Sequence, residues 1–162
     1  SIIHPKTLQP LQKKEIPLHV KSFKNPKSKG TIISKEIEIE PLVPCYIFKE
    51  NLILIKLSSL DFSFMVEDNI SNIFKELHYF KMKVDVIQNS AISFSVCFFD
   101  KYNNIDALVK NLEGKFKIEM HKNVSLFTIR HFNEKSIKKV SNKRKLVLEQ
   151  RTEKTVRLIF SN

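Results

Sequence analysis

The stretch VDVIQNSAISFSV, residues 84–96, holds polar side chains whose types and spacing could do chemistry. The amide pair Gln88-Asn89 and the hydroxyl of Ser90 interrupt two good strand patterns, and the carboxylate of Asp85 comes three residues before Gln88. Carboxamides and hydroxyls both donate and accept hydrogen bonds, so this group could bind a polar ligand. Asn and Ser also favour tight turns on their own account. From the residues alone, a binding site and a plain turn are both open.

The sequence lacks other common catalytic apparatus. Gly30 and Gly114 are its only glycines, which excludes a GxGxxG turn and a GxxxxGK[ST] loop, and there is no GxSxG elbow. The five histidines show no HxxxH or HExxH spacing, and Cys45 and Cys97 lie far apart and outside any CxxC. We therefore expect no catalytic residue, no metal site and two reduced cysteines.

Composition sets the broad class. The chain has 162 residues, is 42% hydrophobic and contains no apolar run near 18 residues or secretory leader pattern, so we expect a cytoplasmic location and no membrane partner. The net charge of +11 comes largely from two lysine-rich stretches, residues 21–29 and 135–145. Solvated loop and helix faces explain both stretches, and we expect no nucleic-acid partner.

Hydrophobic periodicity predicts the elements around the polar stretch. From residue 51 onward their order is β-α-β-β-α-β, which is that of a ferredoxin-like α+β sandwich of about 70 residues. The expected elements are a helix over residues 5–14, strands over 16–22, 31–40 and 51–59, a helix over 66–80, strands over 83–88 and 91–99, a helix over 103–114 and a strand over 115–121.

The chain then repeats itself. Residues 123–131, NVSLFTIRH, resemble residues 51–59, and residues 146–160 align without gaps on residues 84–98, so that Gln150 aligns with Gln88. The second copy has room for only a shortened first helix, about EKSIKKVSN, and it ends after its third strand. We expect the strand at residues 31–40, which precedes the first copy, to supply its missing edge.

This tandem arrangement resembles the regulatory region of aspartate kinases, which is built from tandem ACT domains. The opening segment IIHPKTLQPLQKKEIPLHVKSFKNPKSKGT is similar to the family's HPxT…P…IPxxV…S…P…GT stretch, which joins the catalytic to the regulatory domain. The resemblance implies three parts. They are the end of the catalytic domain and a linker over residues 1–30, a first ACT domain over 45–122, and a second ACT domain formed by 31–44 and 123–162.

The resemblance gives the polar stretch a function. ACT domains pair side by side and hold a free amino acid at the seam, between the loop after the first strand and the end of the second strand. Asp85 matches the acidic position that pairs with the effector's ammonium group. By the same resemblance the effector-binding residues are Asp85, Gln88, Asn89, Ser90, Ser63, Met65 and Val66.

Lysine is the first expected effector and threonine the second. The sequence departs from the family at two points: Val66-Glu67-Asp68 stands where the family usually has a helix-opening glycine, and Ala91 stands where lysine-sensitive members have an acidic side chain.

The resemblance also implies a parent enzyme. An aspartate kinase phosphorylates aspartate with ATP and Mg in the first step of lysine, threonine and methionine biosynthesis, under feedback inhibition. Lys24 and Asn25 match a Lys-Asp pair that contacts nucleotide in the family. The N-terminal kinase motifs are absent, so this fragment should be inactive and hold no cofactor. Its implied partners are the effector, a second copy through the ACT domains, and the kinase domain of the same chain.

Two other functions fit parts of the pattern. A free-standing ACT-type amino-acid sensor would have the same fold, but the kinase-linker resemblance of residues 3–31 argues against it. An RRM-like RNA-binding module would share the element order. It needs exposed aromatics in an RNP1-like run, however, and AISFSVCFF lacks the Lys/Arg-Gly-aromatic opening.

Overall fold

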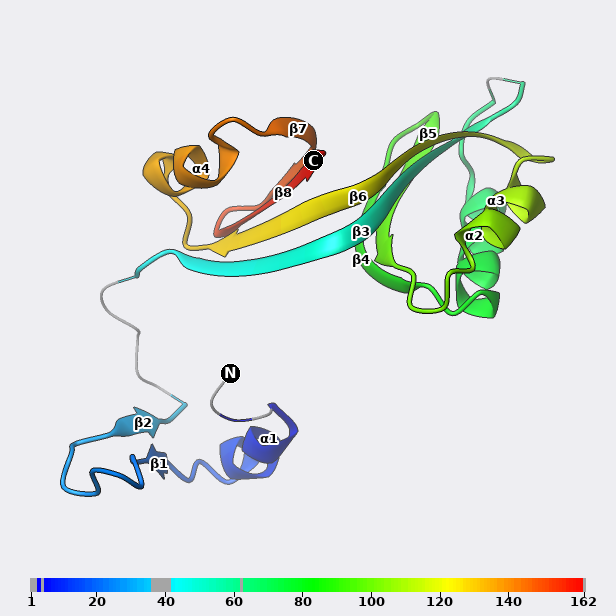
Figure 1. Ribbon diagram of the computed structural model, residues 1–162. Coiled ribbons are helices and arrows are strands. Elements are labelled where there is room, and N and C mark those ends of the chain that lie inside the picture. Colours follow the sequence, from blue (N-terminus) through cyan, green and yellow to red (C-terminus); the bar gives the residue numbers. More distant parts are fainter. Residues whose placement is uncertain (1–2, 4, 36–41, 62, 162) are drawn as a thin grey trace. The chain divides into compact units, whose positions relative to one another are not determined.

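The computed structural model describes residues 3, 5–35, 42–61 and 63–161 (Figure 1). The chain divides into two compact units, Ser1–Leu42 and Val43–Asn162, and each is described by itself. Among the described residues, the helices and strands follow the predicted order, and they form an α+β fold with antiparallel sheets.

The first unit contains one helix and a two-stranded sheet. Helix α1 spans Pro5–Lys13, and strands β1 (Leu18–Val20) and β2 (Thr31–Ile33) pair antiparallel. Gly30 precedes β2 with a φ of 70°, a conformation that suits glycine. A Cβ atom there would lie 2.3 Å from the carbonyl oxygen of Val20, so the close approach of the two strands also requires glycine.

The second unit is built on a six-stranded antiparallel sheet in the order β4-β5-β3-β6-β8-β7. Two long central strands run side by side through it (Figure 1). The elements are β3 (Cys45–Ser59), α2 (Glu67–Tyr79), β4 (Lys83–Asn89), β5 (Ser93–Phe99), α3 (Ile105–Leu112), β6 (Phe116–Arg130), α4 (Glu134–Ser141), β7 (Lys145–Arg151) and β8 (Thr155–Ser161).

The sheet consists of two ferredoxin-like halves that share the central strands. The first half comprises residues 52–59 of β3, α2, β4, β5, α3 and residues 116–121 of β6, and the second comprises residues 124–130 of β6, α4, β7, β8 and residues 45–49 of β3. Asn51 and Asn123 mark the junctions, each with a φ of 57° beside a register shift. Asn tolerates this left-handed conformation better than most residues. The predicted duplication is therefore a tandem of ACT-type halves.

The strand that completes the second half differs from the expected one. Thr31–Ile33 pairs with β1 in the first unit, and residues 36–40 of the predicted strand lie outside the described residues. The edge is formed instead by residues 45–49 of β3, which pair with residues 126–130 of β6. The physical reason is that β3 does not begin at Asn51. It continues through the register shift there and serves both halves.

Hydrogen bonds at the two outer hairpins confirm the repeat. The Ser90 N–H donates to the Ser93 carbonyl at 2.8 Å, and the Thr152 N–H donates to the Thr155 carbonyl at the same distance. The hydroxyls of Ser90 and Thr152 repeat the pattern, accepting from the N–H groups of Ser93 and Thr155 at 3.1 and 3.2 Å. Strands β4 and β7 also share a register shift at equivalent positions.

Three apolar clusters hold the second unit together. One lies between the first half of the sheet and helices α2 and α3, and another packs against α4 on the second half. The third joins side chains of both halves, including Leu54, Val86, Val124 and Ile159. The third cluster therefore spans the junction between the two halves. None of the described helices is long and apolar enough to cross a membrane.

Candidate functional site

The predicted loop and hairpin meet at one end of the first half. The Met65 N–H donates to the Ala91 carbonyl at 2.8 Å, which ties the loop at residues 60–66 to the tip of the β4–β5 hairpin. The Met65 side chain is buried in the core beneath this contact. Side chains from two segments that are distant in sequence are thereby brought to one surface.

The hairpin contains a tight turn and two carboxamide side chains that make no hydrogen bond among the described residues. Ser90 is engaged in the turn, because its hydroxyl lies 2.9 Å from that of Ser93 and its N–H is bonded to the Ser93 carbonyl. Gln88 and Asn89 end β4 with exposed side chains, and no hydrogen bond among the described residues involves either carboxamide. Turn chemistry therefore accounts for Ser90 and leaves both amides free to bind.

The loop contains an acidic residue that the sequence reasoning did not select. The Ser59 hydroxyl donates to the Asp61 carboxylate, and the Ser63 N–H donates to it at 3.0 Å. The hydroxyls of Ser59 and Ser63 lie 2.8 Å apart. Hydrogen bonds from Ser59 and then Ser63 lower the pKa of Asp61 well below its usual range. The Ser-x-Asp-x-Ser spacing of residues 59–63 was the available signal, and it gives the loop a permanent negative charge.

Helix α2 begins where the predicted site ends. Val66 precedes its first turn, and the Val66 N–H donates to the Asn69 side-chain oxygen at 3.1 Å. Glu67 and Asp68 occupy the first turn and are exposed. Carboxylates there interact favourably with the helix dipole. Together with Asp61 they place three negative charges on the loop and the first turn of α2.

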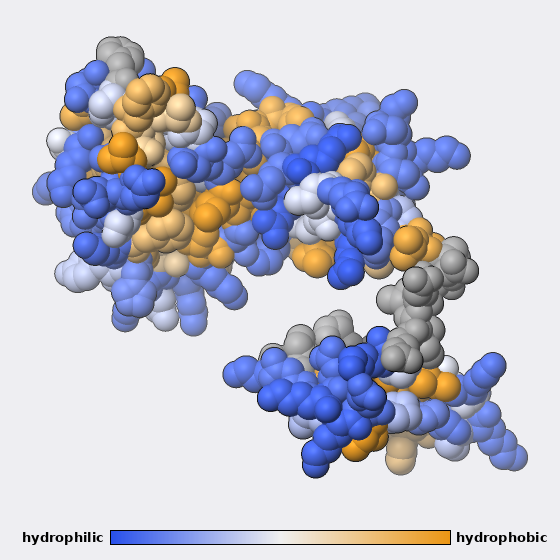
Figure 2. All heavy atoms as spheres, turned by 180° about the vertical axis from the view of Figure 1, so that it is seen from behind, coloured by the Kyte–Doolittle hydropathy of each residue, from blue (hydrophilic) through white to orange (hydrophobic). Residues whose placement is uncertain are grey.

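A hollow of about 570 Å³ adjoins the same end of the sheet. It is large enough for a small polar molecule, and the serines that line it come from the end of β3 and the start of β5. Figure 2 shows hydrophobic side chains gathered on the half of the unit that carries α2 and α3. The hollow is lined by Lys56, Ser58, Ser59, Leu60, Ile92, Ser93, Glu113, Phe116 and Lys117.

Asp85 lies apart from the other predicted residues. It stands at the register shift between Val84 and Val86, and its carboxylate accepts a hydrogen bond from Lys49 of β3. The Asp85 side chain is 11% exposed and that of Lys49 is 42% exposed. Asp85 and Asn89 are four positions apart along β4, which corresponds to about 13 Å at the usual rise per residue. The structure therefore brings the loop and the hairpin together and places Asp85 in a separate ion pair.

Cys97 lies in the core next to this ion pair. It is fully buried, and burial, with a smaller contribution from Asp85, raises the pKa of its thiol to about 12. Cys45 is exposed, and both cysteines are free thiols. No group of three or more His, Cys, Asp or Glu side chains that could hold a metal occurs in the part of the chain that the structure describes.

The predicted nucleotide residues belong to the first unit. Lys24 and Asn25 lie in the loop between β1 and β2, and both are exposed. The Ser28 hydroxyl and N–H donate to the Asn25 carbonyl at 2.9 and 3.2 Å, which shapes the loop. Neither the Lys24 nor the Asn25 side chain has a hydrogen-bond partner within the described ranges.

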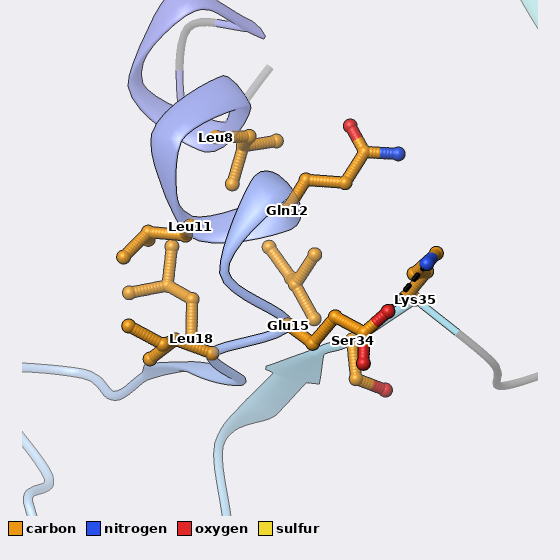
Figure 3. A pocket seen from close by; sticks show the side chains of 9 residues that line it. Leu8, Leu11, Gln12, Glu15, Leu18, Ser34 and Lys35 are labelled. Atoms are coloured by element: carbon orange, nitrogen blue, oxygen red, sulfur yellow. Dashed lines mark hydrogen bonds and ion pairs between the residues drawn. The ribbon is translucent and has the colours of Figure 1, made fainter.

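A separate hollow lies in the first unit (Figure 3). Its volume is about 230 Å³, and leucines of α1 and β1 form its apolar wall. The Lys35 ammonium contacts the Glu15 carboxylate at 2.5 Å beside it. The lining residues are Leu8, Leu11, Gln12, Glu15, Ile16, Leu18, Ile33, Ser34 and Lys35.

Comparison with known proteins gives aspartokinases among the relatives of the chain. No family model matches the chain. The chain is 30% identical over 100 residues to Aspartokinase 1, chloroplastic, of Arabidopsis thaliana, covering 59% of this chain and 17% of that protein. It is 31% identical over 94 residues to Lysine-sensitive aspartokinase 3 of Escherichia coli, covering 57% of this chain and 20% of that protein. The chain thus matches about a fifth of the length of these curated relatives.

Solved structures show the same fold. Clostridium acetobutylicum aspartate kinase superposes with a TM-score of 0.80 at 15% identity, covering 99% of this chain and 41% of that one. E. coli aspartokinase III in complex with lysine and aspartate gives 0.70 at 20% identity, covering 99% and 38%. A putative C-terminal regulatory domain of aspartate kinase from Porphyromonas gingivalis gives 0.59 at 14% identity, covering 74% and 86%. These curated relatives are aspartokinases, and the solved structures show that the chain shares the fold of aspartate kinase regulatory domains.

Proposed function

We propose that the chain regulates an aspartate kinase by binding a free amino acid at the end of the first half. The observation that carries this proposal is the Met65–Ala91 hydrogen bond, which seats the loop against a hairpin whose Gln88 and Asn89 amides are uncommitted. A zwitterion needs hydrogen-bonding partners for both charged groups, because leaving either unpaired on binding is costly. The two amides supply neutral partners, and the exposed Ser63 hydroxyl on the loop can add another.

Lysine is proposed as the first effector and threonine as the second, on the basis of the carboxylates of the loop and the first turn of α2. Asp61, Glu67 and Asp68 place three carboxylates on the loop and the first turn of α2. A ligand with a second positive charge gains electrostatic attraction from these three carboxylates, whereas threonine has no second charged group. The E. coli relative that is 31% identical over 94 residues is named lysine-sensitive, which agrees with this order.

Asp85 lies about 13 Å along β4 from Asn89, so it can join the proposed site only through the far end of an extended effector such as lysine. The Asp85 carboxylate is held by Lys49, so it can receive the effector's ammonium only if Lys49 moves away. The Lys49 side chain is partly exposed and can return to water at little cost. In this proposal, effector binding breaks an ion pair that joins β3 to β4 and is thereby coupled to the sheet.

A homodimer that pairs through the first half would complete the effector site at the seam between the two copies. Strand β4 lies at the edge of the sheet and exposes Ile87, Gln88 and Asn89, and exposed edge strands tend to pair unless they are protected. The Gln150 side chain of the second half already donates to the Ile87 carbonyl at 3.0 Å. The free edge of β4 includes the amide end, where the effector is proposed to bind.

The parent enzyme is proposed to phosphorylate aspartate with ATP and Mg. Lys24 and Asn25 are proposed to contact its nucleotide, and the kinase domain of the same chain would supply the catalytic groups. The effector would favour one arrangement of paired ACT domains, and the first unit would carry that bias to the kinase. ADP production from ATP and aspartate by this chain alone would contradict its assignment as a regulatory fragment.

The test of the site is the substitution Asn89→Ala. Inhibition by lysine and by threonine is measured in the full-length kinase. The melting temperature is measured for the unaltered protein and for the Asn89→Ala protein. Loss of a neutral hydrogen-bonding partner should weaken effector binding by about 1–3 kcal/mol. Inhibition should then require a higher effector concentration while the melting temperature stays the same. A lower melting temperature with unchanged inhibition would show that the hairpin is only a turn.

A further inference from the structure

A small hollow lies where the two halves meet, on the face of the sheet opposite to α4. Its volume is about 190 Å³. The face follows from alternation along β6, because Phe127 and Ile129 pack in the cluster beside α4 and the side chains of Leu126 and Thr128 point the other way. Asp85 is the contribution of the first half. The hollow is lined by Ile47, Lys49, Asp85, Leu126, Thr128 and Arg157.

Arg157 brings a positive charge without an acidic partner into this hollow. Its side chain is partly buried, and its guanidinium donates to the Gln150 side-chain oxygen at 3.1 Å. The Gln150 amide nitrogen donates in turn to the Ile87 carbonyl at 3.0 Å, so a neutral amide holds the guanidinium in place. No carboxylate among the described residues forms an ion pair with Arg157. A partly buried cation without a counter-charge is unfavourable, and a bound anion would offset that cost.

The polar neighbours of Arg157 favour a carboxylate as that anion. Thr128 is paired with Arg157 across the β6–β8 ladder, and its hydroxyl has no hydrogen-bond partner within the described ranges. Lys49 and Asp85 neutralise each other as an ion pair, so the net charge of the lining is that of Arg157. A guanidinium donates two parallel N–H groups to the two oxygens of a carboxylate, and the hydroxyl can donate a third hydrogen bond.

The remaining walls set the size and the charge of the ligand. Leu126 is buried and Ile47 is exposed, and both offer apolar surface to a short hydrocarbon chain. An ammonium group on the ligand would lie near the cations of Lys49 and Arg157, while Asp85 is already held by Lys49. Like charges repel at this range, so the hollow disfavours a zwitterion. A volume of about 190 Å³ limits the ligand to a few carbon atoms.

The first half does not repeat this arrangement. In the gap-free alignments of the two copies, Arg157 aligns with Ser95 and Thr128 aligns with Lys56. Ser95 and Lys56 are paired across the β3–β5 ladder as Arg157 and Thr128 are paired across the β6–β8 ladder. Serine has no charge, however, and a lysine ammonium lacks the fork of two parallel donors. A guanidinium held by an amide is therefore particular to the second half.

We propose that this hollow is a binding site for a small organic carboxylate that carries no ammonium group. Arg157 and the Thr128 hydroxyl bind the carboxylate, and Ile47 and Leu126 contact its short hydrocarbon chain. The site is separate from the proposed effector site, because the hairpin amides and the loop at residues 60–66 do not line it.

The experiment is an NMR titration of the whole 162-residue chain with butyrate at low salt, following the Arg157 side-chain Nε–H and the Thr128 backbone N–H. We expect saturable shifts of both signals. Arg157→Gln should weaken binding at least about tenfold, because a charged hydrogen-bonding partner is lost, and Thr128→Val should weaken it by about threefold. Arg130→Gln is the matched control and should leave binding unchanged. Arg130 is an exposed arginine two residues after Thr128, on the same face of β6 and outside the hollow.

Three further probes test the chemistry of the ligand on the unaltered chain. Butyramide has the shape of butyrate without its charge and should bind at least about tenfold more weakly. L-2-aminobutyrate adds an ammonium group to the same skeleton, and inorganic phosphate replaces the carboxylate, and both should bind more weakly than butyrate. Absence of saturable shifts with butyrate would overturn the proposal. So would tighter binding of any of the three probes, or an equal loss with Arg130→Gln. Thermal melts establish that the variants compared are folded.

Discussion

The β4–β5 and β7–β8 hairpins have the same backbone hydrogen bonds, but their side chains make different hydrogen bonds. Both close through the same hydrogen bonds, from Ser90 to Ser93 and from Thr152 to Thr155. In the second hairpin Gln150 is used twice, because it donates to the Ile87 carbonyl and accepts from Arg157 at 3.1 Å. Its counterpart Gln88 makes no such bond among the described residues. The comparison teaches that the turn supplies stability in both copies, whereas the free amides are particular to the first.

The neighbours of the two glutamines differ in the same way. Arg151, next to Gln150, pairs with Glu149 at 2.9 Å and rests on the Phe132 ring. Asn89, next to Gln88, is exposed and has no hydrogen-bond partner for its side chain within the described residues. Polar groups already engaged within a fold gain less from a ligand than groups exposed to water. The first hairpin is therefore the hairpin suited to binding the effector.

The largest expected effect tests whether the halves form one folding unit. Phe98 and Phe160 are equivalent, and both are fully buried. Replacing either with Ala should lower the free energy of unfolding by about 3–5 kcal/mol. Because a third cluster joins the halves, denaturant unfolding should remain a single transition in both variants. Two separate transitions, each shifted by only one substitution, would show that the halves are independent.

The next effect concerns the ion pair between Lys49 and Asp85. Asp85→Ala should weaken amino-acid binding by about 2–5 kcal/mol, because the ligand's ammonium would lose its charged partner. Lys49→Met is the control, since it removes the competing cation and keeps the carboxylate. Calorimetric titration of both variants should show reduced affinity for Asp85→Ala and no reduction for Lys49→Met. Equal affinity of Asp85→Ala and the unaltered chain would remove Asp85 from the site.

A smaller effect contrasts the two glutamines directly. Gln150→Ala removes two hydrogen bonds and should lower the free energy of unfolding by about 1–2 kcal/mol. Gln88→Ala removes none among the described residues and should change it by less than about 0.5 kcal/mol. Chemical denaturation measures both values. The contrast between the hairpins would fail if Gln88→Ala were the more destabilising variant.

The smallest effect is a pH dependence from Cys97. Its folded pKa of about 12 exceeds the unfolded value near 9, so the unfolded chain releases the thiol proton first as pH rises. The contribution of the protonated Cys97 thiol to the free energy of unfolding is therefore fully present below pH 9. It declines above pH 9, by about 1 kcal/mol at pH 9.5. Urea melts at pH 8 and 9.5 should show this loss in the native chain and less of it in Cys97→Ala. An identical loss in Cys97→Ala would assign the pH dependence to other groups.

Much of the fold could be predicted from the sequence because local patterns determine it. The 3.6-residue spacing of α2 and the alternation of β4 and β5 follow from which face each element buries, and the gap-free repeat predicted the second hairpin. The continuity of β3 through Asn51 could not be read in this way, because the polar residues around Asn51 resemble a turn. The strand that completes the second half was therefore placed too early in the chain.

The site was predictable to the extent that it is local. The loop and the hairpin are each recognisable in the sequence, and Met65 does approach Ala91. The pairing of Asp85 with Lys49 joins residues 36 positions apart and depends on the register shift in β4. No local pattern reports a contact of that kind.

The most direct test is calorimetric titration of the 162-residue chain with lysine and with threonine, repeated for Gln88→Ala/Asn89→Ala and for Gln150→Ala. The proposed site predicts that the unaltered chain and folded Gln150→Ala bind one of these amino acids with similar affinity, lysine being favoured. The Gln88→Ala/Asn89→Ala chain should bind at least about tenfold more weakly, as expected for the loss of two polar partners. Absence of binding by the unaltered chain, or an equal loss of affinity in Gln150→Ala, would contradict the account.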